Sequence, residues 1–476
     1  MNPFVDPVLE MTRRAVLGHA GLGLGAAALS SLLGDGEPAG GRAPHFAPRA
    51  RRVVYLFQNG APSHVDLFDD KPLLRRLHGT QIPDSVVGGR RFSTMVGDQK
   101  ERPLLASIAK FAPRGRSGAT VSEFLPRTAA IADRLCFVKS MFTTQVNHAP
   151  AITFFLTGSE RPGRPTFGAW LSYGLGRDSA DLPTFVVMTS RDREASCGQI
   201  FYDHYWGSGF LPSVHQGVKF RGSGDPVLYL QDPPGIDRGL ARAMLDDVAA
   251  LDRERAGAVG DPEIDTRIAQ YEMASRMQAS VPELTDLSNE PEHVLAMYGP
   301  DVRRKGSYAY NCLLARRLLE RGTRFVQLMH AGWDQHRNLD TQLAIQCRDT
   351  DAPSAALVLD LQQRGLLDDT LVIWGGEFGR TPFVQGKLDA KDRGRDHHPY
   401  AFTLWIAGGG IKAGHTHGAS DELGFEVAAD PVHVHDFQAT LLHLLGIDHE
   451  RLTYRFQGRR YRLTDVHGKV VPGLLA

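Results

Sequence analysis

Short apolar runs recur along the chain and indicate buried β-strands. Each run is continuous rather than alternating, which is typical of strands covered on both faces in a mostly parallel sheet. The runs are VVYLF (53–57), LCFV (135–138), TFVVM (184–188), RFVQLM (324–329), TLVIW (370–374) and FTLWIA (402–407). Segments with helical spacing lie between them, such as GSYAYNCLLARRLLERG and APSAALVLDLQQRGLLDD. The alternation predicts a doubly wound α/β fold, with a mostly parallel central sheet between layers of helices.

One region interrupts this alternation. Residues 233–300 carry charged helical sequence and no strand pattern. We interpret them as a helical insertion that could cover a functional site. The remainder of residues 51–476 contains no internal repeat, so we expect a single domain there.

The first 50 residues have the features of an export signal followed by a linker. Arg13 and Arg14 precede a Gly/Ala/Leu-rich segment from about Ala20 to Leu33, which is too short and too weakly apolar for a comfortable membrane span. A buried N-terminal helix fits poorly, because glycines interrupt the segment. The pattern predicts export by the twin-arginine route, to the periplasm or out of the cell, with no other integral membrane domain. Retention as an N-terminal anchor stays open, since no convincing A-x-A cleavage signal follows.

Charge and cysteine content narrow the classes of partner. Lys plus Arg and Asp plus Glu are 54 each among 476 residues, so the formal net charge is zero and a nucleic-acid partner is not expected. The cysteines lie far apart without a CxxC pair, which argues against a zinc knuckle or a dense disulfide framework and leaves one or two disulfides open. They are Cys136, Cys197, Cys312 and Cys347.

Polar segments follow several of the apolar runs directly. QNGAPSHVDLFD follows VVYLF, HAGWDQH follows RFVQLM, and GGEFGRTP follows TLVIW. Ligands of open α/β sheets bind in the crevice at the carboxyl ends of the strands. We therefore expect a functional site among these segments.

A spacing of two residues between His and Asp or His side chains recurs and indicates a cation site. Residues i and i+2 of an extended segment share a face, so both members of a pair can point into one site. Mixed imidazole and carboxylate ligands suit zinc, manganese or iron and, with fewer histidines, magnesium or calcium. One pair alone is more often a hydrogen-bonded loop. The pairs are His64/Asp66, Asp334/His336, Asp396/His398, His415/His417 and His433/His435.

The segment GRDHHPY contains two adjacent histidines, His397 and His398, and only one of them can point toward a given site if the segment is extended. By the same alternation Asp396 and His398 can point into one site together, and we expect His397 and His398 to face different sites. The His433/His435 pair is the least convincing, because HVHDFQATLLHLLGI resembles the start of a helix that Asp436 can cap.

From Thr12 to its end the chain resembles the DUF1501 family of exported proteins. The motifs that carry the resemblance are NGAPSHVDLFDDKP, NHAPAITFFLTGS, GWDQH, DLQQRGLLDDTLVIWGGEFGRTP, GRDHHPYAFTLWIAGGGIKAG and RLTDVHG. That family looks like a branch of the alkaline phosphatase and sulfatase superfamily. The resemblance implies an alkaline phosphatase-like fold and one or two divalent cations that align a phosphate or sulfate ester.

Several positions depart from the superfamily pattern. His148 stands where the resemblance places the nucleophile, so no hydroxyl is present there. Asp66 is the nearest substitute for an aspartate expected after the first strand, and Glu377 begins the dipeptide that replaces an Asp-His pair. The residues that still look like superfamily ligands are Asp334 and His336, with His397 or His398.

Two functions from different classes are compatible with these residues. In the first, a rewired metallohydrolase binds a divalent metal ion that activates water, so that no serine is needed to cleave a phosphate or sulfate ester of a small molecule or polysaccharide. In the second, a non-catalytic exported binding protein keeps the scaffold and its polar pocket. The metal ligands expected in the first are Asp66, Asp334, His336, Glu377, Asp396, His397 and His398, with His148 beside them as a catalytic residue.

Two arginines and two hydroxyls complete the candidate chemistry. Arg380 and Arg395 could clamp an anionic ester group, or could equally pair with nearby carboxylates. Ser63 and Thr381 are reserve nucleophiles. We expect the ligands to meet at one edge of the sheet, with His148 partly exposed in the same cleft.

Overall fold

The computed structural model contains a central sheet that is mostly parallel, as the sequence predicts. It describes residues 43–191, 200–227, 235–259 and 262–476. The strands of the sheet are β1 (Arg52–Asn59), β4 (Leu135–Phe142), β5 (Phe185–Arg191), β6 (Val218–Phe220), β7 (Phe325–Ala331), β8 (Thr370–Gly375), β11 (Phe402–Ala407), β12 (His415–His417) and β15 (Val432–His433). Their order is β12-β4-β11-β8-β1-β7-β5-β6, with β15 also paired to β4. Only β11 runs antiparallel to its neighbours, β4 and β8.

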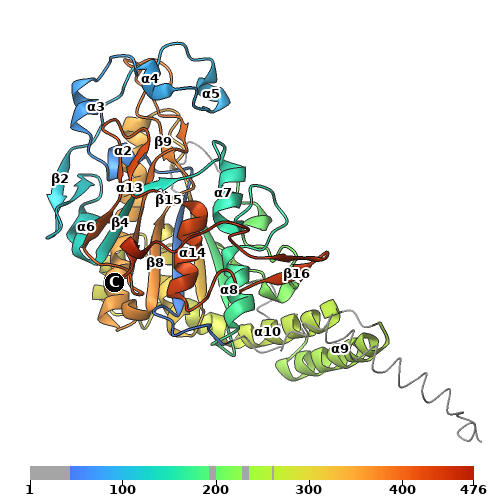
Figure 1. Cartoon of the computed structure of the whole chain (residues 1–476). Coiled ribbons are helices and arrows are strands. Elements are labelled where there is room, and N and C mark those ends of the chain that lie inside the picture. Colours follow the sequence, from blue (N-terminus) through green and yellow to red (C-terminus); the bar gives the residue numbers. More distant parts are fainter. Residues whose placement is uncertain (1–42, 192–199, 228–234, 260–261) are drawn as a thin grey trace, which may run out of the picture. The chain divides into compact units, whose positions relative to one another are not determined.

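Helices cover both faces of the sheet (Figure 1). In β1, Val54 and Leu56 enter one hydrophobic core, whereas Val53, Tyr55 and Phe57 enter the other. Because both faces are covered, the run is apolar throughout. The first core includes α6 (Pro126–Ala130), α11 (Glu292–Tyr298), α12 (Tyr308–Glu320) and α13 (Leu339–Gln363). The second includes α7 (His148–Thr157), α8 (Phe167–Leu175) and α14 (Val434–Leu444).

Polar side chains and glycine set the ends of these helices. Ser307 precedes α12, and its hydroxyl accepts a hydrogen bond from the backbone N–H of Tyr310. Gly158 ends α7 in the left-handed conformation, at φ +68°. At the start of α14 the Asp436 carboxylate accepts from the backbone N–H of His433, so the predicted cap is present.

Smaller elements surround the central sheet. Four two-stranded sheets pair β2 (Phe111–Arg114) with β3 (Ala119–Ser122), β9 (Gly379–Arg380) with β10 (His397–His398), β13 (Ala419–Ser420) with β14 (Val427–Ala429), and β16 (Tyr454–Phe456) with β17 (Arg459–Tyr461). Short helices follow β1, namely α2 (His64–Leu67), α3 (Pro72–Arg76), α4 (Asp84–Val87) and α5 (Thr94–Gly97). Residues 43–476 form one compact unit.

The interrupting region is helical where it is described, with α9 (Arg238–Val259), α10 (Pro262–Thr285) and then α11. The Ser280 hydroxyl of α10 donates to the carbonyl of Asp181, which lies just before β5. This contact places α10 at the amino ends of the parallel strands. Figure 1 likewise shows α9 and α10 at the end of the sheet away from α7 and β9. These two helices therefore do not cover the carboxyl ends, contrary to our expectation.

Two observations bear on the expectations about membranes and disulfides. Within the described residues, no helix combines the length and the apolar character needed to cross a bilayer. Cys136, Cys312 and Cys347 are buried free thiols, and Cys197 lies outside the described residues. The disulfides left open by the sequence are therefore not formed among the three described cysteines.

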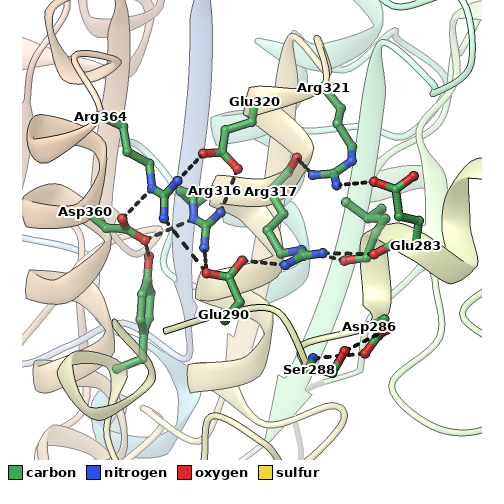
Figure 2. Close-up of polar contacts among 12 residues, drawn as sticks. Glu283, Asp286, Ser288, Glu290, Arg316, Arg317, Glu320, Arg321, Asp360 and Arg364 are labelled. Carbon is green, nitrogen blue, oxygen red and sulfur yellow. Dashed lines mark hydrogen bonds and ion pairs between the residues drawn. The ribbon is translucent and has the colours of Figure 1, made fainter. Parts of the chain in front are cut away.

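A buried ionic network joins α12 to α13 and to the segment before α11 (Figure 2). The Arg316 guanidinium is 2.6 Å from Glu290, 2.6 Å from Glu320 and 3.0 Å from Asp360. Burial lowers the pKa of Arg316, but the hydrogen bonds and charges of these carboxylates outweigh it and raise the pKa above its ordinary value. The arginine is therefore held charged between the helices on this face of the sheet.

Removing one carboxylate from this network should be costly. Asp360 is 1% exposed and also accepts from Tyr298 and Arg364. We expect Asp360→Ala to lower the free energy of unfolding by about 3–5 kcal/mol, because the buried Arg316 loses one of its three carboxylates and the buried Tyr298 hydroxyl loses its acceptor. Asp246→Ala, which breaks an exposed pair with Arg242, should leave the free energy of unfolding nearly unchanged. Urea unfolding measures both, and a loss below about 1 kcal/mol for Asp360→Ala would contradict the assignment.

Candidate metal centre

The directions of the strands bring distant segments to one edge of the sheet. β1, β7 and β8 are parallel, and β4 runs the same way because β11 is antiparallel to both β8 and β4. Their carboxyl ends and the amino end of β11 therefore share an edge. The residues that meet there are His148 after β4, Asp334 and His336 after β7, Glu377 after β8, and His397 before β11.

Asp334 lies at the centre of this group. Its Oδ1 is 3.1 Å from His148 Nε2, 2.9 Å from His336 Nε2 and 3.4 Å from His397 Nε2. The Nε2 atoms of His336 and His397 are 2.8 Å apart, and the four ligand atoms all lie within 4.8 Å of one another. A tetrahedral ion with ligands at about 2.0–2.1 Å holds them about 3.4 Å apart. The group therefore fits a divalent cation after a small expansion.

Each of the three imidazoles is oriented by an oxygen behind it. His148 Nδ1 is 2.5 Å from Glu377 Oε1, His336 Nδ1 is 2.5 Å from the amide oxygen of Gln385, and His397 Nδ1 is 2.7 Å from the carbonyl of Val146. These oxygens accept, so each Nδ1 carries a proton and each Nε2 faces Asp334. Metal-binding histidines have this arrangement, in which the outer hydrogen bond fixes the tautomer.

Burial and neighbouring charges shift the pKa values of His148, His397 and Asp334 in different directions. Burial lowers the pKa of His148, but Asp334 and Glu377 outweigh it and raise the pKa above its ordinary value. Burial, aided by repulsion from His148, lowers the pKa of His397 well below its ordinary value. Burial acts to raise the pKa of Asp334, but the Arg380 guanidinium and the hydrogen bond from His148 outweigh it and lower that pKa. The ion-free centre thus holds a carboxylate, a protonated His148 and a neutral His397.

Two glycines allow the backbone segments to approach this closely. Gly60 follows β1 at φ +105°, and a Cβ there would lie 2.6 Å from the backbone nitrogen of Asp334. A Cβ at Gly394 would lie 2.0 Å from the carbonyl oxygen of His336. Any larger residue at either position would displace the Asp334–His336 loop.

The structure does not bring every predicted ligand into the group. Asp66 is fully buried beside Arg395, at 2.7 Å from its Nε, and accepts from the Ser63 hydroxyl as well. His398 instead meets the carbonyl of Phe425 through Nε2. These are corrections to the expected ligand set. The histidine that joins Asp334 is His397, because β10 pairs with β9 in a register that turns His397, and not His398, toward the group.

Glu377 and Asp396 contact the Nδ1 atoms of the histidines, on the side of each ring away from Asp334. Glu377 Oε1 accepts from His148 and from the backbone N–H of Gly60. Asp396 Oδ1 is 3.6 Å from His336 Nδ1, on the outer side of that ring. Both carboxylates therefore contact histidines of the group. Gln385 holds His336 in the same way and was missed by sequence reasoning, because its amide carries no signal beyond following GGEFGRTP.

The arginines and hydroxyls proposed for catalysis already form hydrogen bonds or ion pairs with other groups of the protein. Arg380 is 1% exposed and donates to Asp334 at 2.7 Å and to the carbonyl of Ala61 at 3.0 Å. Arg395 is fully buried against Asp66 and the carbonyls of Leu105 and Ala106. Both arginines thus pair with carboxylates, which corrects the anion-clamp alternative. The hydroxyls offered as reserve nucleophiles, those of Ser63 and Thr381, are buried and donate to Asp66 and to the Phe383 carbonyl.

His148 and His336 keep the centre accessible. Their side chains retain 12% and 14% of their surface, whereas Glu377 behind His148 is fully buried. The partial exposure expected of His148 is therefore present.

The sequence assigns the chain to a family. Residues 50–475 match the family described as "Protein of unknown function (DUF1501)". The chain belongs to this family.

Comparison with known proteins adds distant likenesses in structure. No curated protein matches the sequence. Ps i-CgsB in complex with k-i-k-neocarrahexaose is 10% identical, with a TM-score of 0.35 over 83% of this chain and 72% of that one. The lipoteichoic acid synthase LtaP from Listeria monocytogenes is 10% identical, with a TM-score of 0.33 over 90% and 78%. The PsFucS1 sulfatase from Pseudoalteromonas sp. is 13% identical, with a TM-score of 0.31 over 85% and 68%.

The raised pKa of His148 can be tested in protein without a bound ion. His148 should titrate above the ordinary value of about 6.5, and Glu377→Gln should lower its pKa because a stabilising carboxylate is lost. Because the pKa is raised on folding, the stability that it contributes is present below pH 6.5 and is lost as the pH rises through the raised value. NMR of labelled histidine measures the titration. His398 is the internal control, since burial lowers its pKa to about 3 and it should stay neutral. Titration of His148 at or below 6.5 would contradict the assignment.

Proposed function

We propose that this DUF1501 protein is an exported, metal-dependent hydrolase of phosphate or sulfate esters. The observation that carries the proposal is the convergence of three imidazole Nε2 atoms on the Asp334 carboxylate at the carboxyl edge of the sheet. Among hydrolases, such a nitrogen-rich set suits zinc, manganese or iron better than calcium or magnesium. Bound there, the ion would act as a Lewis acid toward the ester and lower the pKa of water.

The residues of the centre divide into two roles. We assign Asp334, His336 and His397 as metal ligands, because catalytic sites commonly use three protein ligands and leave a position open. His148 is assigned to carry a proton at Nε2, because its pKa is raised and Glu377 fixes its ring through Nδ1. Water is the nucleophile in this proposal, because the nearby hydroxyls donate to buried protein acceptors.

The alternative function is that of a non-catalytic binding protein on the same scaffold. One observation favours it: Arg380 and Arg395 are both held by protein carboxylates, so neither is available to clamp an anionic ester. A binding protein would keep the polar centre without turnover. Metal content and ester hydrolysis separate the two functions.

Substitutions at the centre should separate ligands from the proton carrier. Purified protein should contain near-stoichiometric divalent metal and hydrolyse an aryl phosphate or sulfate ester. Asp334→Ala should lower metal content and activity together, by at least about tenfold each. His148→Gln should lower activity by about 10²–10⁴-fold while keeping most of the metal. Elemental analysis and release of the aryl alcohol measure the two quantities.

His443→Ala is the matched control, because this histidine lies on α14 with its ring 5.0 Å from that of Phe46. Both quantities should stay within twofold of the unsubstituted protein. Protein that folds normally, binds no metal and hydrolyses neither type of ester with any of these ions added would support the binding protein instead.

Export is proposed from the sequence, since residues 1–42 lie outside the described part of the chain. We expect Arg13→Lys with Arg14→Lys to retain the protein in the cytoplasm, because the twin-arginine route requires both arginines. Cell fractionation measures the distribution. Arg90→Lys with Arg91→Lys changes another adjacent pair and should leave export unchanged. Equal export of both double variants would contradict the proposal.

A further inference from the structure

A cavity of about 510 Å³ lies where α7 ends and α14 begins. Its wall is built from Phe154 and Gly158 of the α7 end, the loop that follows α7, and the histidines around the α14 start. None of the four residues of the candidate metal centre lines it. We call this cavity the lateral groove. It is a separate polar site that the proposed hydrolysis does not use.

Two buried polar atoms in the wall of the lateral groove have no hydrogen-bond partner among the described residues, His435 Nδ1 and Arg164 Nη1. His435 is 4% exposed, and its Nε2 donates to the carbonyl of Gly158 at 3.0 Å, so Nδ1 keeps a lone pair. Arg164 uses Nη2 for Asp465 at 3.1 Å, which leaves Nη1 as a free donor. Burial without partners is unfavourable for both atoms. The wall of the groove thus holds one unpartnered acceptor and one unpartnered cationic donor, each with almost no exposed surface.

An arginine-rich hairpin borders the groove. Residues 451–462 contain five arginines, and β16 and β17 form the hairpin within this segment. Figure 1 shows β16 extending outward beside α8. Asp465 of the groove pairs with Arg164 and also with Arg459 of the hairpin, and Arg164 lies 5.4 Å from the centre of the Tyr461 ring. The groove and the hairpin are therefore one continuous surface.

Aromatic rings add flat apolar faces to this surface. Phe210 stacks on Phe456 with centroids 5.1 Å apart and contacts Tyr461 at 4.9 Å. Phe456 remains 36% exposed at the tip of the stack. Exposed rings beside polar groups suit a ligand that has both apolar faces and polar edges, as the pyranose ring has.

We propose that the lateral groove and its hairpin bind an anionic saccharide, whose rings carry carboxylate, sulfate or phosphate groups. Arg161 at the groove is exposed and forms no ion pair with any described residue. It meets the anionic groups, and the charge of Arg164 in the groove wall adds to the attraction. The aromatic stack of Phe210 and Phe456 packs against a ring face.

A nucleic acid fits this surface less well. The chain has no net formal charge, and the groove also presents the carboxylates of Glu160 and Asp465, which a continuous phosphate backbone would meet. A saccharide can place hydroxyls at these carboxylates and anionic groups at the arginines. The mixture of acceptors and cations therefore favours spaced charges on a hydroxylated ligand.

Titration calorimetry with size-defined dextran sulfate tests the proposal, with neutral dextran as the reference and polygalacturonate as the carboxylated probe. Dextran sulfate, polygalacturonate or both should bind, and neutral dextran should bind at least about tenfold more weakly. Arg161→Gln with Arg164→Gln should weaken binding of the anionic probe by at least about tenfold. Arg114→Gln with Arg116→Gln, on the β2–β3 hairpin, is the matched control and should change it by less than twofold.

A third variant tests the groove itself. Glu160→Gln removes a carboxylate from its wall and should strengthen binding of the anionic probe, because one repulsive charge is lost. None of these variants touches the metal centre, so hydrolysis of a small aryl ester should be unchanged in all of them. Failure of the saccharide proposal is thereby distinguishable from failure of the proposed hydrolase function.

Three results would overturn the proposal. The first is absence of binding to both anionic probes, and the second is an equal loss in the β2–β3 control. The third is binding of polyadenylate, at equal charge and salt, at least as tight as that of dextran sulfate, which would identify the surface as a general polyanion site. Any of these results removes the saccharide assignment, whatever the metal content of the protein.

Discussion

The candidate metal centre depends on three hydrogen bonds that orient three imidazole rings. An accepting oxygen stands behind each Nδ1, from Glu377, Gln385 and the Val146 carbonyl, so the three Nε2 atoms face one carboxylate. Lone pairs this close repel unless a positive charge lies among them. In the ion-free protein the proton on His148 and the Arg380 guanidinium supply that charge. A divalent cation supplies it more fully, which is why this geometry favours metal over an empty polar pocket.

The sheet makes this arrangement possible. Residues separated by more than two hundred positions meet because the strands that precede them point the same way, and because one antiparallel strand, β11, brings the segment before it to the same edge. Gly60 and Gly394 then let the loops touch where a Cβ would clash with the Asp334–His336 backbone. The buried Asp66–Arg395 pair fixes the segment that carries His397, since Arg395 precedes it by two positions.

Much of the fold and part of the centre could be predicted from the sequence. Continuous apolar runs reveal strands covered on both faces, and the rule for carboxyl ends points to Asp334 and His336. The choice between His397 and His398 could not be made, because alternation says only that they diverge, and the pairing of β10 with β9 decides which one turns inward. The partners of Arg395 were also out of reach, because Asp66 lies 329 positions away. Long-range pairing of this kind leaves no local pattern.

The most direct test of the central claim is a crystal structure of metal-loaded protein with anomalous scattering measured at the absorption edge of the ion. The account predicts one strong peak about 2.0–2.2 Å from Asp334 Oδ1, His336 Nε2 and His397 Nε2, with the Glu377, Gln385 and Val146 oxygens still bonded to Nδ1 of their histidines. A bound ion elsewhere in the chain would contradict it, if the side chains of His148, Asp334, His336 and His397 are still in mutual contact.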